Sequence, residues 1–309
     1  MESYSILKKR KNPFVTIGIH FSLILVSITC IFPVAWMISS SLKTQEMIFE
    51  DMGLIPKTFE ISNYTKALIE GKFGIAFFNS CFYTVTVIIG VVLVSSLAAY
   101  AFSRLEFPGK NILFYGFLAY MMLPIPGIFL ALYVLVNKLG DLTSFTIDLS
   151  FIGLSFLKDP INITIIGINT RLGFIMPQIA MNLSFAIYML KTFFDKMPPE
   201  LEEAARIDGC SKFGVYWHVA LPLAKSALGV IVIFNALTIW NEFLWANLIF
   251  SDISRMPLPV ALMKFQGSVV TQYPVLMAGM TITIIPIVIL YLCMQKYIIK
   301  GITAGAVKG

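Results

Sequence analysis

Residues 75–102 read IAFFNSCFYTVTVIIGVVLVSSLAAYAF and contain no charged side chain. A helix of this length is about 42 Å long at roughly 1.5 Å per residue, whereas the hydrocarbon core of a bilayer is about 30 Å thick. The stretch therefore predicts a helix that spans a membrane.

Five further apolar stretches are long enough to span: 14–38, 111–136, 172–190, 226–250 and 275–294. They predict an all-α, polytopic membrane protein with six transmembrane helices. The third carries Pro124, Pro126 and Gly127 in its middle, which predicts a bent helix. The composition agrees, because 13% of the 309 residues are charged and the mean hydropathy is +0.83. An average soluble domain has about 25% charged residues, so an ordinary soluble enzyme is excluded.

The distribution of Lys and Arg predicts the orientation, because basic residues in short loops stay preferentially on the cytoplasmic side. Of the 23 basic residues, 14 lie in segments 1–13, 103–110, 191–225 and 295–309, which together carry a net charge of +7. The other loops carry no net charge. Both termini are therefore expected in the cytoplasm. The positive total needs no nucleic acid as a partner to explain it.

The expected organisation is a basic N-terminus (1–13), a first span with its external loop (14–74), a membrane domain (75–294) with a cytoplasmic loop at 195–225, and a tail (295–309). The first span follows four basic residues, as in a signal peptide, but it is too long and lacks a small-residue cleavage site, so we expect a retained anchor. Residues 141–170 are interrupted by charges and by Pro160. They are expected to form an external loop with room for one interfacial helix.

Motifs for catalysis are missing from the sequence. It contains no G-x-x-x-x-G-K-[ST] phosphate loop, and its two histidines form no Ser-His-Asp or H-E-x-x-H pattern. The four cysteines are far apart and predict neither a disulfide framework nor a zinc site. We therefore expect no enzyme activity, no metal and no cofactor in this chain.

The loop DKMPPELEEAARIDGCSKFGVYWHVALPLAK, residues 195–225, shows clear local design. Two prolines can open a helix, three glutamates follow where the helix dipole favours anions, and Gly209 can end it in a left-handed conformation. A helix is predicted over about 199–208 and a second over 211–218. Leu201, Ala204 and Ala205 share one face of the first helix, which suits docking into a cleft of another protein. Composition alone equally allows an amphipathic connector lying on the lipid headgroups.

A resemblance to a known family decides between these readings. Glu203, Ala204, Ala205 and Gly209, followed by Val219, Leu221 and Pro222, resemble the EAA signature of permease subunits of ATP-binding-cassette (ABC) importers. The segments NS (79–80), SSLAAYAFSR (95–104), FPGK (107–110), MMLP (121–124), WNEF (240–243), LPV (258–260) and GITAGAVKG (301–309) resemble landmarks of the maltose-type carbohydrate permeases with the MetI-like fold, covering residues 75–309. The segment 141–164 departs from that family.

The resemblance implies that the chain is half of a heterodimeric pore in a prokaryotic inner membrane. Its partners would be a second permease subunit, two ATPase subunits that use ATP and Mg, an extracytoplasmic solute-binding protein and membrane lipid. The ATPase-coupling residues would be Glu203, Ala204, Ala205, Gly209, Leu221 and Pro222. The tail would reach between the ATPase subunits, and the loop 251–274 would touch the binding protein.

Six polar or amphipathic residues in the apolar stretches are candidates for the pathway or its gate: Asn79, Asn235, Thr238, Trp240, Asn241 and Glu242. Interhelical hydrogen bonding is the commoner role for such amides and hydroxyls. A carboxylate at the bilayer centre is costly, so Glu242 is expected near the external end, as gate or as interfacial anchor.

The substrate expected from the resemblance is a sugar or oligosaccharide, with glycerol phosphate or another polar solute as the alternative. An ion-coupled secondary transporter is a further alternative, although such proteins carry several ionisable groups within the membrane. A membrane-embedded enzyme would need a cluster of reactive groups at one depth, and the sequence has none.

Overall fold

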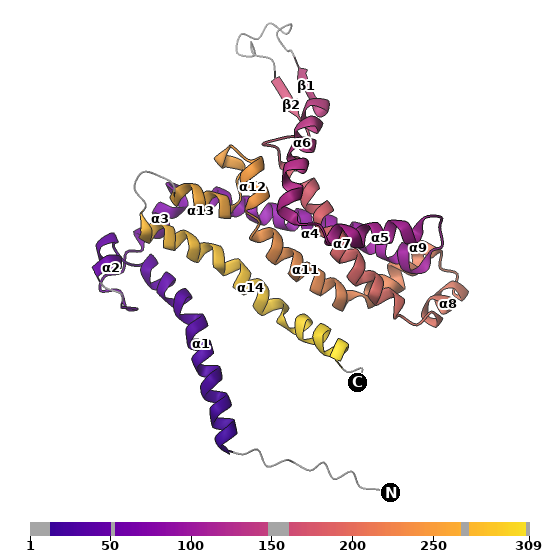
Figure 1. Cartoon of the computed structure of the whole chain (residues 1–309), viewed down its shortest axis with the longest axis horizontal. Helices are drawn as coiled ribbons and strands as arrows, with labels where there is room; N and C mark the ends of the chain where they lie inside the picture. Colours follow the sequence, from indigo (N-terminus) through magenta and orange to yellow (C-terminus); the bar gives the residue numbers. More distant parts are fainter. Residues whose placement is uncertain (1–12, 51–52, 148–160, 267–271, 307–309) are drawn as a thin grey trace.

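The computed structural model describes residues 13–50, 53–147, 161–266 and 272–306, and most of them are helical (Figure 1). Four helices contain segments long and apolar enough to cross a membrane: α1 (Pro13–Ser41), α4 (Phe73–Arg104), α7 (Arg171–Asp195) and α14 (Tyr273–Ala306). A fifth candidate is the bent pair formed by Lys212–Leu223 and α11 (Lys225–Trp240), which meet at 72°. The described part of the chain is therefore a transmembrane helical bundle.

Shorter elements connect these helices. They are α2 (Gln45–Glu50), α3 (Ser62–Ile69), α5 (Lys110–Met121), α6 (Ile125–Thr143), α8 (Glu200–Ile207), α9 (Lys212–Val215), the π-helical turn η2 (Tyr216–Ala220), α10 (Leu221–Leu223), α12 (Leu244–Ile249), the 3-10 turn η3 (Ile253–Arg255) and α13 (Leu258–Gln266). Two antiparallel strands, β1 (Ser144–Ile147) and β2 (Ile161–Thr164), pair Ser144 with Thr164 and Ile147 with Ile161.

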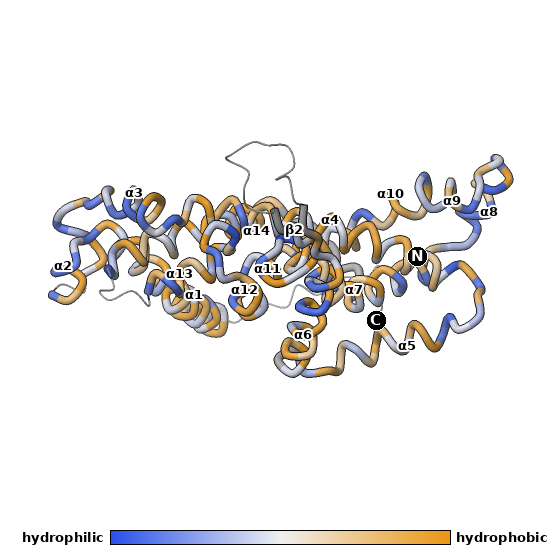
Figure 2. Tube along the Cα trace, turned by 90° about the horizontal axis from the view of Figure 1, so that it is seen from above, coloured by the Kyte–Doolittle hydropathy of each residue, from blue (hydrophilic) through white to orange (hydrophobic). Residues whose placement is uncertain are grey.

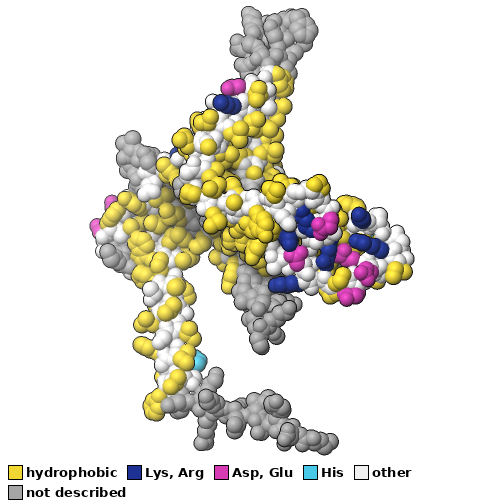
Figure 3. Space-filling view, turned by 45° about the vertical axis from the view of Figure 1, so that its right-hand side comes forward, with side chains coloured by type: hydrophobic (Ala, Val, Ile, Leu, Met, Phe, Trp, Pro, Cys, Tyr) yellow, Lys and Arg dark blue, Asp and Glu magenta, His cyan; other side chains and the backbone are white. Residues whose placement is uncertain are grey.

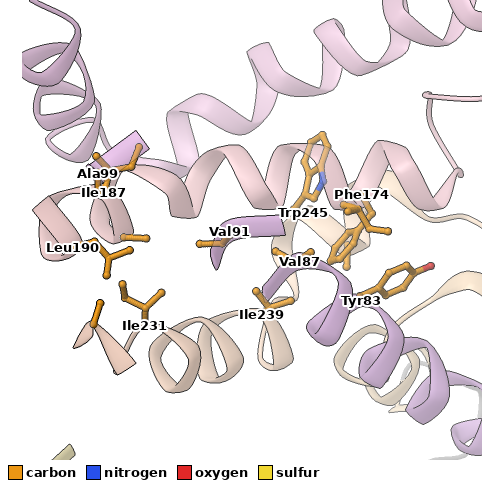
Figure 4. Packing of buried hydrophobic residues seen from close by; sticks show 14 of the residues in the cluster. Tyr83, Val87, Val91, Ala99, Phe174, Ile187, Leu190, Ile231, Ile239 and Trp245 are labelled. Carbon is orange, nitrogen blue, oxygen red and sulfur yellow. The ribbon is translucent and has the colours of Figure 1, made fainter. Parts of the chain in front are cut away.

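The core forms where α4 packs along α7, with α11 and α12 closing the sides. Figure 4 shows Val87 and Val91 of α4 facing the same core as Leu190 of α7 and Ile231 of α11. The helices approach closely at Gly90, where an added Cβ would overlap the side chain of Ile179. Small residues permit such close packing between helices in membranes.

The polar parts of the chain lie at the two ends of this bundle. In Figure 2 the blue, hydrophilic segments gather around α2 and α3 at one end and around α8 and α9 at the other. Figure 3 shows Lys, Arg, Asp and Glu side chains clustered at the α8 end beside a largely apolar surface. This distribution is the one expected of a bundle whose middle lies in hydrocarbon.

The break predicted at the prolines of the third apolar stretch is confirmed. Residues 111–136 do not form one helix, because α5 ends at Met121 and α6 begins at Ile125 after an extended Pro124. Helix α6 turns away from the bundle and carries the two strands with it (Figure 1). Neither α5 nor α6 qualifies alone as a spanning helix.

The structure corrects one other expectation and adds detail to a second. The stretch 226–250 is not one helix, because α11 ends at Trp240 and the carboxylate of Glu242 accepts the N–H groups that start α12. The segment after α6, expected as an external loop, contains the strand pair β1–β2, and residues 148–160 lie outside the described residues. The expected basic N-terminus also falls outside them up to residue 12.

Replacing Gly90 with Ile tests the α4–α7 contact. The larger side chain overlaps Ile179, and overpacking of this kind costs about 1–3 kcal/mol, so the purified protein should unfold at a lower temperature. A matched control is Gly116→Ile in α5, where an added Cβ meets no atom within 4 Å. Equal unfolding temperatures for the two variants would contradict the assignment.

Candidate functional site

Helix α8 is short, with a proline before its first residue and a glycine shortly after its last. Pro199 precedes it, and Glu200, Glu202 and Glu203 occupy its first turn. Gly209 has φ +90°, and the next N–H, that of Cys210, donates to the Ala205 carbonyl at 2.9 Å. A glycine in the left-handed region is a common helix stop because it lacks a Cβ. The predicted helix over about 199–208 and its glycine stop are confirmed.

One face of α8 is buried against its own chain and the other is exposed. Leu201 is 44% exposed and Ala204 is also exposed, whereas Ala205 is only 9% exposed. The expectation that Ala205 shares an open face with Leu201 and Ala204 is therefore corrected, because Ala205 packs inward. Glu203 lies on the exposed side.

A buried ion pair joins α8 to the end of α4. Arg104 Nε donates to Glu202 Oε1 at 2.7 Å, and Arg104 Nη2 donates to the Met197 carbonyl at 2.7 Å. The Tyr100 hydroxyl donates to Glu202 Oε2 at 3.3 Å, and the Glu202 side chain is only 5% exposed. Sequence reasoning missed this pair. The available signals were Arg104, which follows the apolar stretch 75–102, and Glu202, which directly precedes Glu203 of the EAA signature.

The same end of α4 makes two more polar contacts with the loop 195–225. Ser103 Oγ donates to Asp195 Oδ1 at 2.7 Å, at the C-terminus of α7. The hydroxyl groups of Ser96 and Tyr216 lie 2.8 Å apart in a buried hydrogen bond. The coupling candidates therefore lie on a scaffold that α4 holds from one side.

After the glycine, the chain forms a second helical segment. Ser211 caps α9 by accepting the N–H of Gly214 at 3.1 Å, and the helix continues through η2 into α10, which contains Leu221 and Pro222. The helix predicted over 211–218 is confirmed and extends further.

Two of the pathway candidates have structural partners at the opposite end of the bundle. The Asn79 amide is buried and donates to the carbonyls of Ser254 and Met256 at 2.8 and 3.1 Å. Trp240 is 6% exposed, and its indole N–H donates to the Thr283 carbonyl at 3.1 Å. These residues hold the loop after α12 and the helix α14, and neither lines the cavity described below. Asn235 is also buried, and its Nδ2 donates to the Ile231 carbonyl.

The other three pathway candidates come together at one cavity of about 490 Å³. Thr238 at the end of α11 and the following Asn241 and Glu242 line it together with residues of α5, α6, α7 and α12. Each oxygen of the Glu242 carboxylate accepts one N–H, from Trp245 at 2.7 Å and Ala246 at 2.9 Å. Glu242 therefore anchors the start of α12 and also borders the cavity.

Long apolar helices, a charged end with an exposed short helix, and a mostly apolar cavity with a few polar groups between the helices are the features of a membrane transport component. The chain belongs to the family of binding-protein-dependent transport system inner membrane components, which it matches over residues 90–304. Members of this family are permease subunits of ABC importers, work with other ABC subunits and a binding protein, and are transport components, not enzymes.

Similar proteins agree with this assignment. The chain is 33% identical to the probable ABC transporter permease YurM of Bacillus subtilis, over 93% of this chain and 87% of that protein. It is 31% identical to the trehalose/maltose transport system permease MalG of Thermococcus litoralis, over 93% and 94% of the two chains. A chain from a bacterial ABC transporter involved in import of the acidic polysaccharide alginate has the same fold, with a TM-score of 0.75, 23% identity, and coverage of 96% and 99%.

Replacing Arg104 with Gln tests whether the ion pair holds α8. A hydrogen bond to a charged group contributes about 1.5–3 kcal/mol, so its loss should let α8 open more often. We expect faster amide hydrogen exchange in residues 200–207 and unchanged exchange in α3. Lys110→Gln is the control, because it breaks the Lys110–Glu106 pair, whose glutamate is 90% exposed. Equal protection of α8 in both variants would refute the role of Arg104.

Proposed function

We propose that this chain is one half of the pore of an ABC importer that takes up a sugar or oligosaccharide. In this proposal a second permease subunit completes the pore, and two ATPase subunits hydrolyse ATP with Mg. An extracytoplasmic solute-binding protein delivers the solute. The relative named for trehalose/maltose transport supports the substrate class. The complex would lie in the inner membrane of a prokaryote, surrounded by lipid.

We further propose six crossings with both termini in the cytoplasm. The four long helices, the bent pair that includes α11, and the broken pair α5–α6 would be the six. This orientation places the charged α8 end in the cytoplasm, together with the four segments that hold 14 of the 23 basic residues.

The observation that carries the proposal is helix α8, which has one exposed face, is stopped at Gly209 and is joined to α4 by the Arg104–Glu202 pair. We propose that Leu201, Glu203 and Ala204 enter a cleft of an ATPase subunit. In this proposal the buried Ala205 packs the helix against its own chain, and Gly209, Leu221 and Pro222 set the shape of the loop. Nucleotide can shift a pore between two states only if the two states bind the nucleotide-loaded ATPase with different affinities. The contact between α8 and the ATPase must therefore differ between these states. A helix stopped at both ends and tied to α4 transmits displacement better than a flexible loop.

Reconstitution tests this function directly. The complete complex in proteoliposomes should accumulate radiolabelled maltose, trehalose, arabinose or glycerol 3-phosphate only with loaded binding protein outside and ATP with Mg²⁺ on the ATPase side. Uptake of glycerol 3-phosphate alone would replace the sugar assignment. Uptake by the chain without ATPase subunits, driven by an ion gradient, would refute the importer assignment.

Replacing Gly209 with Val tests the coupling role. No atom lies within 4 Å of an added Cβ, so the effect comes from the left-handed backbone, which a β-branched residue adopts at a cost of roughly 1–3 kcal/mol. We expect the ATPase activity of the complex to lose its response to the binding protein, or the ATPase subunits to dissociate in a pull-down. Gly109→Val, at φ +80° in the loop before α5, is the matched control. Normal transport and normal ATPase retention in the Gly209 variant would contradict the coupling role.

A further inference from the structure

The loop 195–225 has two halves of opposite charge. Residues 200–208, which contain α8, hold four acidic residues and one arginine, which gives a net charge of −3. Residues 209–225 hold two lysines, Lys212 and Lys225, and no acidic residue, which gives a net charge of +2 with His218 neutral. A charged surface that attracts one half of the loop therefore repels the other half.

The basic half turns aromatic side chains outward. It consists of α9, η2 and α10, in which Val215 and Tyr216 are buried against the rest of the chain. On the outer side Phe213 is 64% exposed and Trp217 is 52% exposed, and their rings stack with centroids 6.4 Å apart. Leu223, further along, is also exposed. Apolar area of this kind is stabilised when it is removed from water.

The bend before α11 sets the direction of this segment. The helical piece Lys212–Leu223 meets α11 at 72°. Membrane-spanning helices tilt on average about 20° from the bilayer normal, so a segment at this angle to α11 runs closer to the membrane plane than to the normal. Its outer side therefore faces a single level of the bilayer along its length.

A hydrogen bond to α4 sets that level. The hydroxyl groups of Tyr216 and Ser96 lie 2.8 Å apart, and Ser96 is about 9 Å from the end of the apolar stretch 75–102 at roughly 1.5 Å per residue. The stretch is about 12 Å longer than the hydrocarbon core is thick, so about 6 Å of it extends past each hydrocarbon boundary. The segment is thus held close to the boundary between hydrocarbon and headgroups.

Helix α8 is held at a different level. Its Glu202 binds Arg104, which lies about 12 Å beyond Ser96 along α4 and follows the apolar stretch. The acidic half of the loop is therefore attached outside the level of the hydrocarbon, where anionic headgroups repel it. It stays accessible to a protein, whereas the basic half lies at the membrane interface.

The composition of the outer side fits that interface. Tryptophan and tyrosine are enriched at the level of the headgroups, where a ring meets apolar chains on one side and water on the other. Helices that lie in the interface plane combine such rings with lysines, and anionic lipids attract the lysines. Lys212 and Lys225 are both exposed, one near each end of the segment.

We propose that α9, η2 and α10 form an interfacial anchor, in which Phe213 and Trp217 insert among lipid headgroups and Lys212 and Lys225 bind anionic headgroups. The anchor goes beyond the proposed function, because it rests on the membrane position of the bundle and on no property of the solute. Of the two roles that composition allows for the loop, docking to a protein then belongs to α8 and contact with lipid belongs to the segment after Gly209.

The depth of Trp217 tests the anchor. The full chain is placed in nanodiscs whose lipids carry bromine either near the carbonyl end or near the methyl end of the acyl chain, and tryptophan fluorescence is measured. We expect stronger quenching by bromine near the carbonyl end, and Trp217→Phe should lose about half of this quenching. Trp245→Phe is the matched control, because Trp245 is fully buried and should contribute almost none of it.

The lysines are tested by hydrogen exchange in the complete complex. Nanodiscs of phosphatidylcholine are compared with nanodiscs that contain equal parts of phosphatidylcholine and phosphatidylglycerol. Exchange in residues 212–220 should be slower with the anionic lipid, and Lys212→Gln or Lys225→Gln should each remove about 5-fold of this protection, which corresponds to about 1 kcal/mol per basic residue at an anionic surface. Lys66→Gln in α3, at the other end of the bundle, should change nothing.

The outcomes separate lipid from protein as the partner. Absence of quenching of Trp217 by bromine near the carbonyl end would overturn the anchor. Protection of residues 212–220 that requires the ATPase subunits and is equal in both lipids would assign the outer side to that protein, and it would overturn the anchor as well. If the unmodified complex imports no sugar while these lipid measurements hold, the proposed function fails and the anchor stands.

Discussion

The packing of α4 along α7 is the contact on which the rest of the structure depends. It forms the centre of the core, and close approach at Gly90 leaves no room for a side chain larger than hydrogen without displacing Ile179. Both ends of α4 then carry the polar groups that hold the neighbouring loops. A helix with 32 residues spans about 48 Å, so α4 connects the two polar ends of the molecule in one rigid element.

The polar side chains of α4 are arranged by helical periodicity. Ser96, Tyr100, Ser103 and Arg104 follow the spacing i, i+4, i+7 and i+8, and all four bond the loop or helix ends between Asp195 and Tyr216. At the other end, Asn79, Ser80 and Tyr83 bond the backbone of the segment between Ser254 and Leu258. Hydrogen bonds in surroundings of low dielectric are strong and costly to leave unmade, so these contacts fix both loops on α4.

Much of this architecture was predictable from the sequence, and the failures have physical reasons. Apolar length located the four long helices, Pro124 located the break between α5 and α6, and the prolines, glutamates and Gly209 located α8, because each acts through its nearest neighbours in the chain. Hydropathy did not reveal that α11 ends at Trp240, since the apolar segment of α12 follows after only three residues. The hairpin β1–β2 also follows from pairing between separated segments, which hydropathy does not encode.

The site was predictable to a smaller extent. The exposed side of α8 follows from its own pattern, but the burial of Ala205 depends on where the helix packs. Arg104 and Glu202 are 98 residues apart, and a single sequence offers many other charge pairings. A hydrogen-bond role for Asn79 was the commoner expectation for such a residue, and the structure identifies its partners. The cavity needed Gln178 of α7 and Thr238 of α11 to be brought together, which no local pattern states.

The position of the cavity links the two ends of the proposed mechanism. Its α7 wall, with Gln178 and Asn182, belongs to the helix that continues directly toward α8 and is bound at Asp195 by Ser103 of α4. Its opposite wall comes from α11, which is separated from the loop 195–225 by a 72° bend. Because packed interiors switch between arrangements instead of deforming gradually, the proposed mechanism has a displacement of α8 act first on α4 and α7 as one unit. In the proposed mechanism the α7 and α11 walls of the cavity then shift relative to each other, which would link the ATPase to the pore.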